Sequence, residues 1–495
     1  MKRTNGIGSD LLWLGLGSVA YAFIGWRWSA PAAAWIAPVF LLRFFRNQEK
    51  WHTPLLALPC LYAAFLTNMI GAWDLPVIAQ IVLPAIVPLP LILVLYIDRA
   101  LSPRLAGIGS TLVFPATYVT VDYFLGFTPL GTLFSTGSTQ FPFSTVVQTA
   151  SITGIWGISF LIAWFASVVN TAWENDFNLK LSQGSGRILL IRNPVALFAV
   201  TALLVITYGS VRIATAPSRA QTVGVAGVTV EHLRDYWALL DLGTPKEEVD
   251  KFRSEIRAIE DELFRQSTRA VQAGARIVFW AEGNGVVSED DLERFISRSG
   301  EFAGTNGIYF APAILELRYG TNLNYNEVLM FTPEGELAFT YQKTKSWLPV
   351  DSDGVIKTIE TPYGTLAAAI CFDLDFPGFL RQAAKAGTDI MLVPGYDSER
   401  IRPFHTEPAL IRGVEGGYSV VRQVNEGTSM AADHYGVVLA RQDYFMTQDR
   451  VMVAAVPIRG ARTLYGYLGD WFAYVCILLM ILLAILGIRN AARRN

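Results

Sequence analysis

Charged residues are scarce in this chain of 495 residues. Asp, Glu, Lys and Arg together make up 17%, whereas apolar residues reach 52% and the mean hydropathy is +0.35. Soluble domains carry roughly 25% charged residues, so the composition excludes an ordinary soluble enzyme and indicates a membrane protein. The net charge of -2 also lacks the basic excess of nucleic-acid-binding proteins, and no nucleic-acid partner is expected.

Cysteine and histidine are scarce as well. Of the three cysteines, Cys60 and Cys476 lie within apolar runs, so neither is expected to pair with Cys371 and no disulfide framework is predicted. The four histidines are His52, His232, His405 and His434. They lack the close spacing of zinc ligands, so we interpret them as structural or surface residues and predict no metal or organic cofactor.

Long apolar runs are what the chain has in abundance. Eight of them approach the roughly 20 residues that cross a hydrocarbon core. They lie near residues 10–28, 31–45, 53–71, 76–97, 105–126, 150–173, 194–213 and 467–488. The runs predict a membrane bundle of about eight transmembrane helices.

Basic residues gather in alternate loops between these runs. Clusters precede the first run and follow the second, fourth, sixth and eighth, for example at Lys2, Arg3, Arg43, Arg46, Lys180, Arg187, Arg489 and Arg494. Because such residues stay preferentially in the cytoplasm, we expect both termini there and the long segment between the last two runs outside. The first run also resembles a secretory signal, but another run follows at once, so we interpret it as an uncleaved anchor.

The composition changes near Ala214. From there to about Thr463 the chain is charged, and strand patterns alternate with helix patterns over a length that suits one large domain. This order predicts a mixed sheet arrangement covered by helices. The predicted organisation is a seven-helix membrane region at 1–213, an α/β domain at 214–463, and a last transmembrane helix with a basic tail at 464–495.

Residues 364–377, GTLAAAICFDLDFP, contain the only cysteine of this domain. The small apolar run Leu366–Ile370 predicts a buried strand that delivers Cys371 to a sharp exit, with Asp373 and Asp375 just beyond. Such a placement is typical of a nucleophile. A buried structural thiol is the alternative for a lone cysteine.

Two further residues fit cysteine acyl chemistry, which needs a thiolate, a base and a cation near the carbonyl oxygen. Glu282 ends the strand RIVFWAE, where an ionised carboxylate needs a partner. Lys343 ends the strand ELAFTYQK, and Lys345 lies on the same face of an extended chain. A surface glutamate and solvated lysines are the alternatives for these positions.

Taken in order, these residues resemble the Glu-Lys-Cys triad of the nitrilase superfamily. Seven spans, an extracytoplasmic domain of this type and one closing span resemble the apolipoprotein N-acyltransferase family, membrane-embedded members of that superfamily. Three further segments resemble patterns of this family. They are LYGYLGDWFAY, NLNYNEVLMFTPEGELAFTYQK, and HTEPALIRGVEGGYSVVRQVNEG, which contains Arg412, Glu415, Arg422 and Asn425. The resemblance covers essentially the whole chain and implies an αββα sandwich for the domain.

The resemblance implies a role for each residue of the triad. Cys371 is the expected nucleophile, Glu282 the general base and Lys343 the cation that stabilises the oxyanion. The nearby ammonium is expected to lower the thiol pKa and make thiolate available near neutral pH. Supporting or substrate-binding roles are implied for Phe372 (through its backbone NH), Asp373, Asn326, Asp351 or Asp353, and Trp347 beside Leu348 at a lipid entrance.

The resemblance further implies a two-step acyl transfer. A membrane phospholipid would acylate the cysteine, and the N-terminal amine of a diacylglyceryl-modified apolipoprotein would accept the acyl chain. The expected protein is a monomer of the bacterial cytoplasmic (inner) membrane, with its catalytic domain on the periplasmic side. The alternatives are a membrane-bound nitrilase-type amidase or hydrolase that uses water, and a silent binding or transport protein. Transport is disfavoured because ionisable residues such as Asp122 are rare in the runs.

Overall fold

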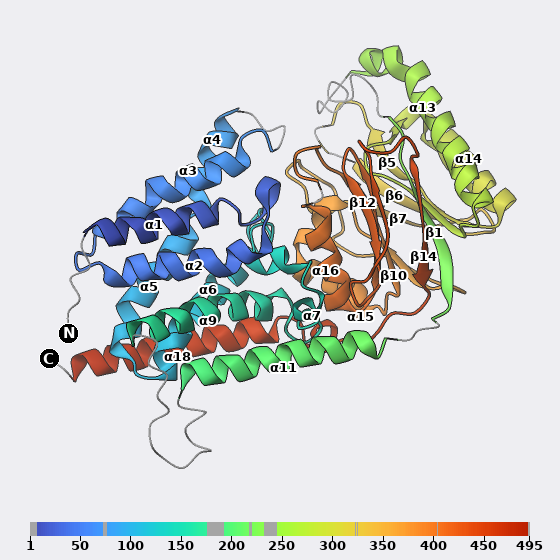
Figure 1. The fold of residues 1–495 in the computed structure, drawn as a ribbon. Coiled ribbons are helices and arrows are strands. Elements are labelled where there is room, and N and C mark those ends of the chain that lie inside the picture. Colours follow the sequence, from blue (N-terminus) through green and yellow to red (C-terminus); the bar gives the residue numbers. More distant parts are fainter. Residues whose placement is uncertain are drawn as a thin grey trace. The chain divides into compact units, whose positions relative to one another are not determined.

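The computed structural model describes residues 7–72, 77–175, 193–216, 220–231, 245–321, 323, 325–402 and 404–493. The chain divides into two compact units, which are coloured along the sequence in Figure 1. The helical unit comprises Met1–Thr215 and Leu468–Asn495, and the sheet unit comprises Ala216–Tyr467. His232 and the loop residues Lys2, Arg3, Lys180, Arg187 and Arg494 lie outside the described residues.

The helical unit consists of apolar helices. The longer ones are α1 (Ile7–Tyr21), α2 (Pro31–Asn47), α3 (Ala57–Met69), α4 (Val77–Ile86), α5 (Leu89–Leu101), α6 (Ile108–Leu125), α9 (Ile155–Glu174), α11 (Pro194–Ala214) and α18 (Trp471–Ala492). Four segments are long and apolar enough to cross a membrane, namely Val77–Arg104, α9, α11 and α18. The helical character of this part is therefore confirmed, whereas the number of eight spans stays a prediction.

Several buried polar side chains of the helical unit are hydrogen-bonded, which offsets the cost of their burial. Arg46 Nε donates to the fully buried Asp98 at 2.8 Å. Asp470, which precedes α18, accepts a hydrogen bond from Trp156 Nε1 in α9 at 2.7 Å. The next residue, Trp471, donates through Nε1 to the carbonyl of Ile152 at 2.8 Å. The Gly-Asp-Trp sequence thus fastens the start of α18 to the region around α9.

The sheet unit contains two stacked sheets. The larger has the order β14-β1-β2-β4-β6-β5-β3 with β7 beside β6, and the smaller has the order β13-β12-β11-β10-β9-β8. The strands of the larger sheet are β1 (Thr222–Val228), β2 (Ile277–Trp280), β3 (Gly285–Ser288), β4 (Tyr309–Ala311), β5 (Ala313–Leu317), β6 (Tyr325–Phe331), β7 (Leu337–Gln342) and β14 (Val451–Pro457). Those of the smaller are β8 (Thr358–Thr361), β9 (Gly364–Ala368), β10 (Ile390–Tyr396), β11 (Ser419–Asn425), β12 (Thr428–Ala432) and β13 (Val438–Asp443).

Helices cover the outer face of each sheet. Figure 1 shows α13 (Lys246–Gln272) and α14 (Leu292–Asn306) on the larger sheet, and α15 (Pro377–Lys385) and α16 (Thr406–Gly416) on the smaller one. The layers are therefore helix, sheet, sheet and helix. This is the αββα sandwich that the resemblance implies.

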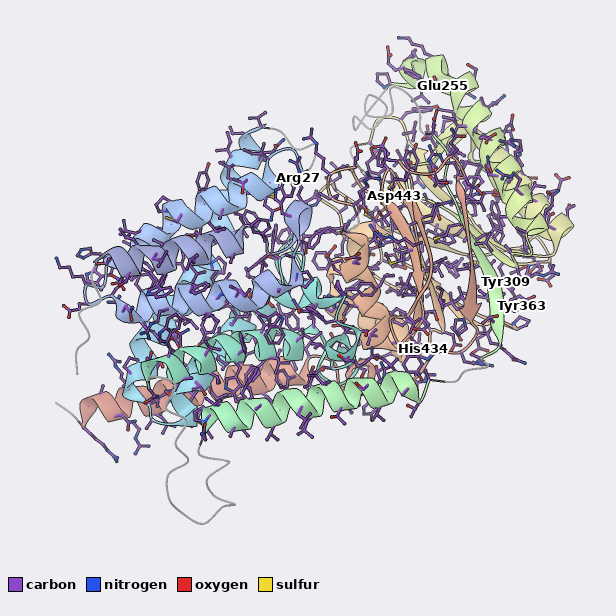
Figure 2. All side chains as sticks on the ribbon, in the orientation of Figure 1. Arg27, Glu255, Tyr309, Tyr363, His434 and Asp443 are labelled. Carbon is purple, nitrogen blue, oxygen red and sulfur yellow. The ribbon has the colours of Figure 1, made fainter. Side chains whose placement is uncertain are left out.

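The alternation of side chains along each strand builds two cores. In β2, Ile277 and Phe279 join the core between the sheets, whereas Val278 and Trp280 join the core beneath α13 and α14. Strands buried on both faces read as continuous apolar runs, which is why IVFW was readable as a strand. Tyr309 and Tyr363, labelled in Figure 2, add an edge-to-face contact between the sheets at 6.3 Å.

Three strands were not predicted from the sequence. β3, β8 and β13 each lie at an edge of their sheet. The residues of β8 and β13 are all exposed or half-buried. Edge strands lack the apolar run of central strands, so their pattern is weak and the pairing of their neighbours decides their structure.

Candidate active site

Cys371 lies at a sharp turn after a buried strand, as the sequence predicts. Strand β9 ends at Ala368, and Cys371 begins the short 3-10 helix η6 (Cys371–Asp375). Its φ of 47° is left-handed, a conformation that only one other non-glycine residue of the described chain, Glu426, shares. Such a backbone costs roughly 1–2 kcal/mol for an L-residue and persists where the surroundings enforce it. The turn places the thiol at the carboxyl end of the parallel strands β9 and β10.

Glu282 and Lys343 meet at the corresponding end of the larger sheet. Lys343 Nζ lies 2.6 Å from Glu282 Oε1, and Asn326 Nδ2 donates to the same oxygen at 2.7 Å. The other oxygen, Oε2, is buried and has no hydrogen-bond partner among the described residues. Both contacts thus orient the carboxylate and leave one of its oxygens available to accept a proton.

The pKa values of the Cys371 thiol and of the Lys343 ammonium group are both raised. Burial raises the pKa of Cys371 to about 12, with a further rise from the charge of Glu282 that Lys343 and Arg422 only partly oppose. Burial lowers the pKa of Lys343, but the charges of Glu282 and Cys371 outweigh it, so the net pKa lies above its usual value. The raised pKa runs against the expectation of a thiolate near neutral pH, since burial and the charge of Glu282 favour the protonated thiol.

Asp373 joins the cysteine turn to the segment that carries Lys343. Its fully buried carboxylate accepts four hydrogen bonds. The donors are Tyr341 Oη (2.5 Å), Ile370 N (2.9 Å), Thr344 N (3.2 Å) and Lys345 N (2.7 Å). Burial raises the pKa of Asp373 to about 6, although these bonds and Lys343 oppose the rise. The carboxylate is ionised at neutral pH and ties the two sheets together at the site.

The two lysines separate in space. Lys343 contacts Glu282, whereas Lys345 Nζ lies over the rings of Phe376 at 4.9 Å and Phe379 at 5.7 Å. β7 ends at Gln342, so the strand alternation that would place both lysines on one face does not continue beyond it. Of the two candidates, the structure brings Lys343 to the glutamate.

Phe372 and Trp347 form an aromatic pair beside the cysteine. The centroids of their rings are 5.5 Å apart and the rings are stacked. Trp347 is 57% exposed, and its neighbour Leu348 is 41% exposed. Phe372 is the second residue of η6, and the first amides of a helix have no partner within it. Its NH is thus suited to the predicted role of oxyanion donor.

Asp351 and Asp353 lie on the exposed segment that follows Lys343. Asp353 pairs with Lys357 and accepts a hydrogen bond from the NH of Val355 at 2.9 Å. The contacts found among the described residues do not join either aspartate to Glu282, Lys343 or Cys371. A supporting role for these two residues stays a prediction.

A second charged cluster near Cys371 was missed by the sequence reasoning. Arg422 Nη2 lies 3.9 Å from the sulfur, 3.1 Å from Asp397 Oδ1 and 3.2 Å from His405 Nδ1. His405 also contacts Asp397 at 2.7 Å and Asp375 at 3.1 Å. His405 is thus a partly buried member of the site rather than a plain structural histidine. The signal was the position of Asp397 directly after the apolar strand β10.

The sulfur of Cys371 and side-chain atoms of Asp397 and His405 lie within 4.8 Å of one another, a spacing that could suit a metal. However, the guanidinium of Arg422 contacts all three residues. A fixed positive charge at this distance repels a divalent cation strongly in a buried setting. We therefore interpret the group as an ion network.

Comparison with known proteins assigns the sheet unit to a family. Residues 255–464 match the carbon-nitrogen hydrolase family. An apolipoprotein N-acyltransferase of Geobacter metallireducens is 23% identical over 427 residues, which cover 78% of this chain and 75% of the relative. One of Gloeobacter violaceus is 34% identical over 143 residues, 28% of this chain and 26% of the relative.

Hydrolases are similar to a smaller share of the chain. A probable hydrolase of Schizosaccharomyces pombe is 24% identical over 37% of this chain and 79% of the relative. The crystal structure of an amidase from Nesterenkonia shares 17% identity with a TM-score of 0.40, over 53% of this chain and 98% of the amidase. Relatives that match both parts of the chain, by contrast, are N-acyltransferases. Relatives that are similar over most of the chain, together with the carbon-nitrogen hydrolase match, therefore support an apolipoprotein N-acyltransferase of the nitrilase superfamily.

Proposed function

We propose that this chain moves an acyl group from a membrane phospholipid, through a thioester on Cys371, to the N-terminal amine of a diacylglyceryl-modified apolipoprotein. The observation that carries the proposal is the meeting of Glu282 and Lys343 from one sheet with Cys371 from the other. Nucleophile, base and cation are the three groups that acyl transfer through cysteine requires. The names of the relatives support the choice of substrates.

In the first step the thiol attacks the ester carbonyl of the phospholipid. Glu282 Oε2 takes the thiol proton as the sulfur–carbon bond forms. A base is needed because the pKa of the thiol is raised. Lys343 and the Phe372 NH stabilise the oxyanion. The tetrahedral intermediate then breaks its carbon–oxygen bond, Glu282 returns the proton to the departing oxygen, and a lysophospholipid leaves.

In the second step the α-amine of the acceptor attacks the thioester carbonyl. Glu282 takes a proton from the amine, the carbon–sulfur bond breaks, and the thiolate regains a proton from Glu282. The products are an amide and the free thiol, so the enzyme returns to its starting state. Asn326 keeps Glu282 oriented through both steps by its hydrogen bond to Oε1.

The remaining predicted residues have places in this scheme. Asp373 holds the Lys343 segment against the cysteine turn through its bonds to backbone amides. The exposed ring of Trp347, stacked on Phe372, offers an apolar surface for the acyl chain beside the nucleophile. Asp351 or Asp353 would supply a further carboxylate when substrate is bound.

The membrane arrangement is part of the proposal. In the sequence the sheet unit is inserted between α11 and α18, two helices that are long and apolar enough to span a membrane. Anchoring at both ends raises the effective concentration of a domain at the bilayer, where both substrates reside. We propose eight spans, cytoplasmic termini, a periplasmic catalytic domain at 214–463 and a monomeric enzyme of the inner membrane.

A hydrolase that uses water as acceptor is the second candidate. It is favoured by the similarity to the S. pombe hydrolase, which spans 79% of that hydrolase but only 37% of this chain. The same triad would serve either acceptor, because the thioester is common to both. The acceptor must therefore be tested directly.

Intact-mass spectrometry of the purified full chain decides between these functions. Incubation with phospholipid should add one acyl chain to Cys371, and a diacylated lipopeptide should then remove it and gain the same mass. The variant Cys371→Ala should show no adduct, whereas Cys60→Ala in α3 should behave as the natural chain. Failure to form any adduct would exclude the acyltransferase. An adduct discharged by water but not by the lipopeptide would identify the hydrolase.

A further inference from the structure

Cys371 lies between two cations, and the proposed mechanism uses only one of them. Lys343 comes from the larger sheet, whereas Arg422 comes from β11 in the smaller sheet and is fully buried. Its Nη2 is within contact distance of the sulfur, at 3.9 Å. Burying a charge is costly unless it is paired, and Arg422 is paired with Asp397 at 3.1 Å, so the pair holds a positive charge beside the reacting sulfur.

We propose that Arg422 is a further catalytic residue, whose guanidinium stabilises the Cys371 thiolate, and that Asp397 and His405 are positioning residues that hold it there. The inference rests on the proposed function only for the moments at which the thiolate forms. These are the attack on the phospholipid and the departure of sulfur from the thioester. In both steps the sulfur atom carries a partial or full negative charge.

The residues around Arg422 fix the orientation of its guanidinium group. Its Nε donates to Thr406 Oγ1 at 3.1 Å, and its Nη2 is shared by Asp397 Oδ1 and the sulfur. A Cβ atom on Gly395 of β10 would lie 3.1 Å from the guanidinium carbon, so a larger residue there would press on the arginine. The guanidinium is therefore packed against the strand that precedes Asp397, with little freedom to turn away.

Arg422, His405, Asp397 and Asp375 form a cluster of two cationic and two acidic side chains. In this cluster the positive charge of Arg422 still acts on the sulfur of Cys371. Burial and the charge of Arg422 lower the pKa of His405, but the charge of Asp397 and the hydrogen bonds with Asp375 and Asp397 outweigh them and raise the pKa to about 9. In the protonated form that this pKa favours, Nδ1 would donate to Asp397 and Nε2 to Asp375. Because His405 already compensates the carboxylate of Asp397, that carboxylate does not cancel the positive charge that Arg422 presents to the thiol.

The two cations have different tasks in this arrangement. Lys343 is hydrogen-bonded to Glu282, so its charge is largely engaged by the base that takes the proton. Arg422 has no contact with Glu282 among the described residues and acts on the sulfur itself. An opposite charge within about 4–6 Å shifts a pKa by about 1–3 units. The charged groups that face Cys371 are Glu282, Lys343, Asp373, Asp375, Asp397, His405 and Arg422.

Alkylation of Cys371 by iodoacetamide measures its thiolate fraction without any lipid. The full chain in detergent is treated between pH 7 and 9, and the rate is read for the Cys371 peptide by mass spectrometry, with the Cys60 peptide as an internal reference. Arg422→Gln should lower the Cys371 rate about tenfold or more at each pH. His405→Gln should lower it in the same direction by a smaller factor.

Arg412→Gln is the matched control. Arg412 is also a fully buried arginine, but it pairs with Glu415 in α16, and the described contacts of Cys371 do not include it. Its removal should leave the Cys371 rate within twofold of the natural chain. An unchanged rate in Arg422→Gln, or an equal fall in Arg412→Gln, would overturn the proposal.

A second variant keeps the test decisive if Arg422→Gln does not fold. His405→Gln retains the arginine, so an unchanged rate in that variant would equally reject the inference. The assay is also independent of the acyl donor. A natural chain that forms no acyl adduct would count against the proposed function, while the alkylation rates would still decide whether Arg422 acts on the thiol.

Discussion

The two sheets supply different chemistry to the same site. The larger sheet contributes a carboxylate with one free oxygen, held by Asn326 and Lys343. The smaller sheet contributes the thiol and the ion pair of Arg422 and Asp397. Proton transfer is thus assigned to one sheet, and the nucleophile with its fixed electrostatic field to the other. A site divided in this way works only while the sheets keep their register.

The clearest way to break this division is to remove the proton acceptor of the larger sheet. Glu282→Gln keeps an oxygen for Asn326 and Lys343 but cannot take the thiol proton. We expect acylation of Cys371 by phospholipid to slow by about 10²–10⁴-fold, measured by intact mass over time. Glu327→Gln, which changes a neighbouring glutamate of β6, should keep the natural rate, and equal losses in both variants would refute the role of Glu282.

Lys343 tests the cation of the same sheet. Lys343→Met removes both the oxyanion donor and the partner of Glu282, and the acylation rate should fall by about 10²–10³-fold. Lys345→Met removes a lysine of the same segment that lies over Phe376 and should change the rate little. If Lys345→Met proved the more damaging change, the assignment of the catalytic lysine would have to be reversed.

His405 tests the smaller sheet through stability. Its folded-state pKa of about 9 exceeds the usual 6.5, so its contribution is complete below pH 6.5 and is lost as the pH rises through 9. The Tm of the natural chain should exceed that of His405→Gln by about 5 °C at pH 6. The gap should close by pH 10. A gap independent of pH would mean that His405 is not charged in the folded chain.

Trp347 is expected to give the smallest effect, because the residue is more than half exposed. Trp347→Ala removes a stacking contact with Phe372 worth about 0.5–1.5 kcal/mol, so donors with long acyl chains should bind a few-fold more weakly. Short-chain donors should be affected less. Phe445→Ala, an exposed aromatic change elsewhere in the sheet unit, is the control. A loss independent of chain length would contradict a lipid contact.

The sequence was sufficient for the parts of the site that follow apolar strands. Glu282, Lys343 and Cys371 each lie within three residues of the end of a central or paired strand, and strands of this kind have a readable pattern. The position of Arg422 could not be read, since 51 residues separate it from Cys371 and only the pairing of β9, β10 and β11 brings them together. The protonated thiol was equally unreadable, because it depends on burial and on the balance of several charges.

The carboxylate of Asp373 has a consequence for how the chain could be divided. The exposed segment around Trp347 and Asp351 separates a part with Glu282 and Lys343 from a part with Cys371. Exposed segments of this kind are where proteases cut first. Because Asp373 holds the two parts together through hydrogen bonds to Tyr341, Thr344 and Lys345, and the core between the sheets adds to this, a nicked chain should keep its halves associated. The enzyme could then be expressed as two complementing fragments, each inert alone and each bringing half of the chemistry.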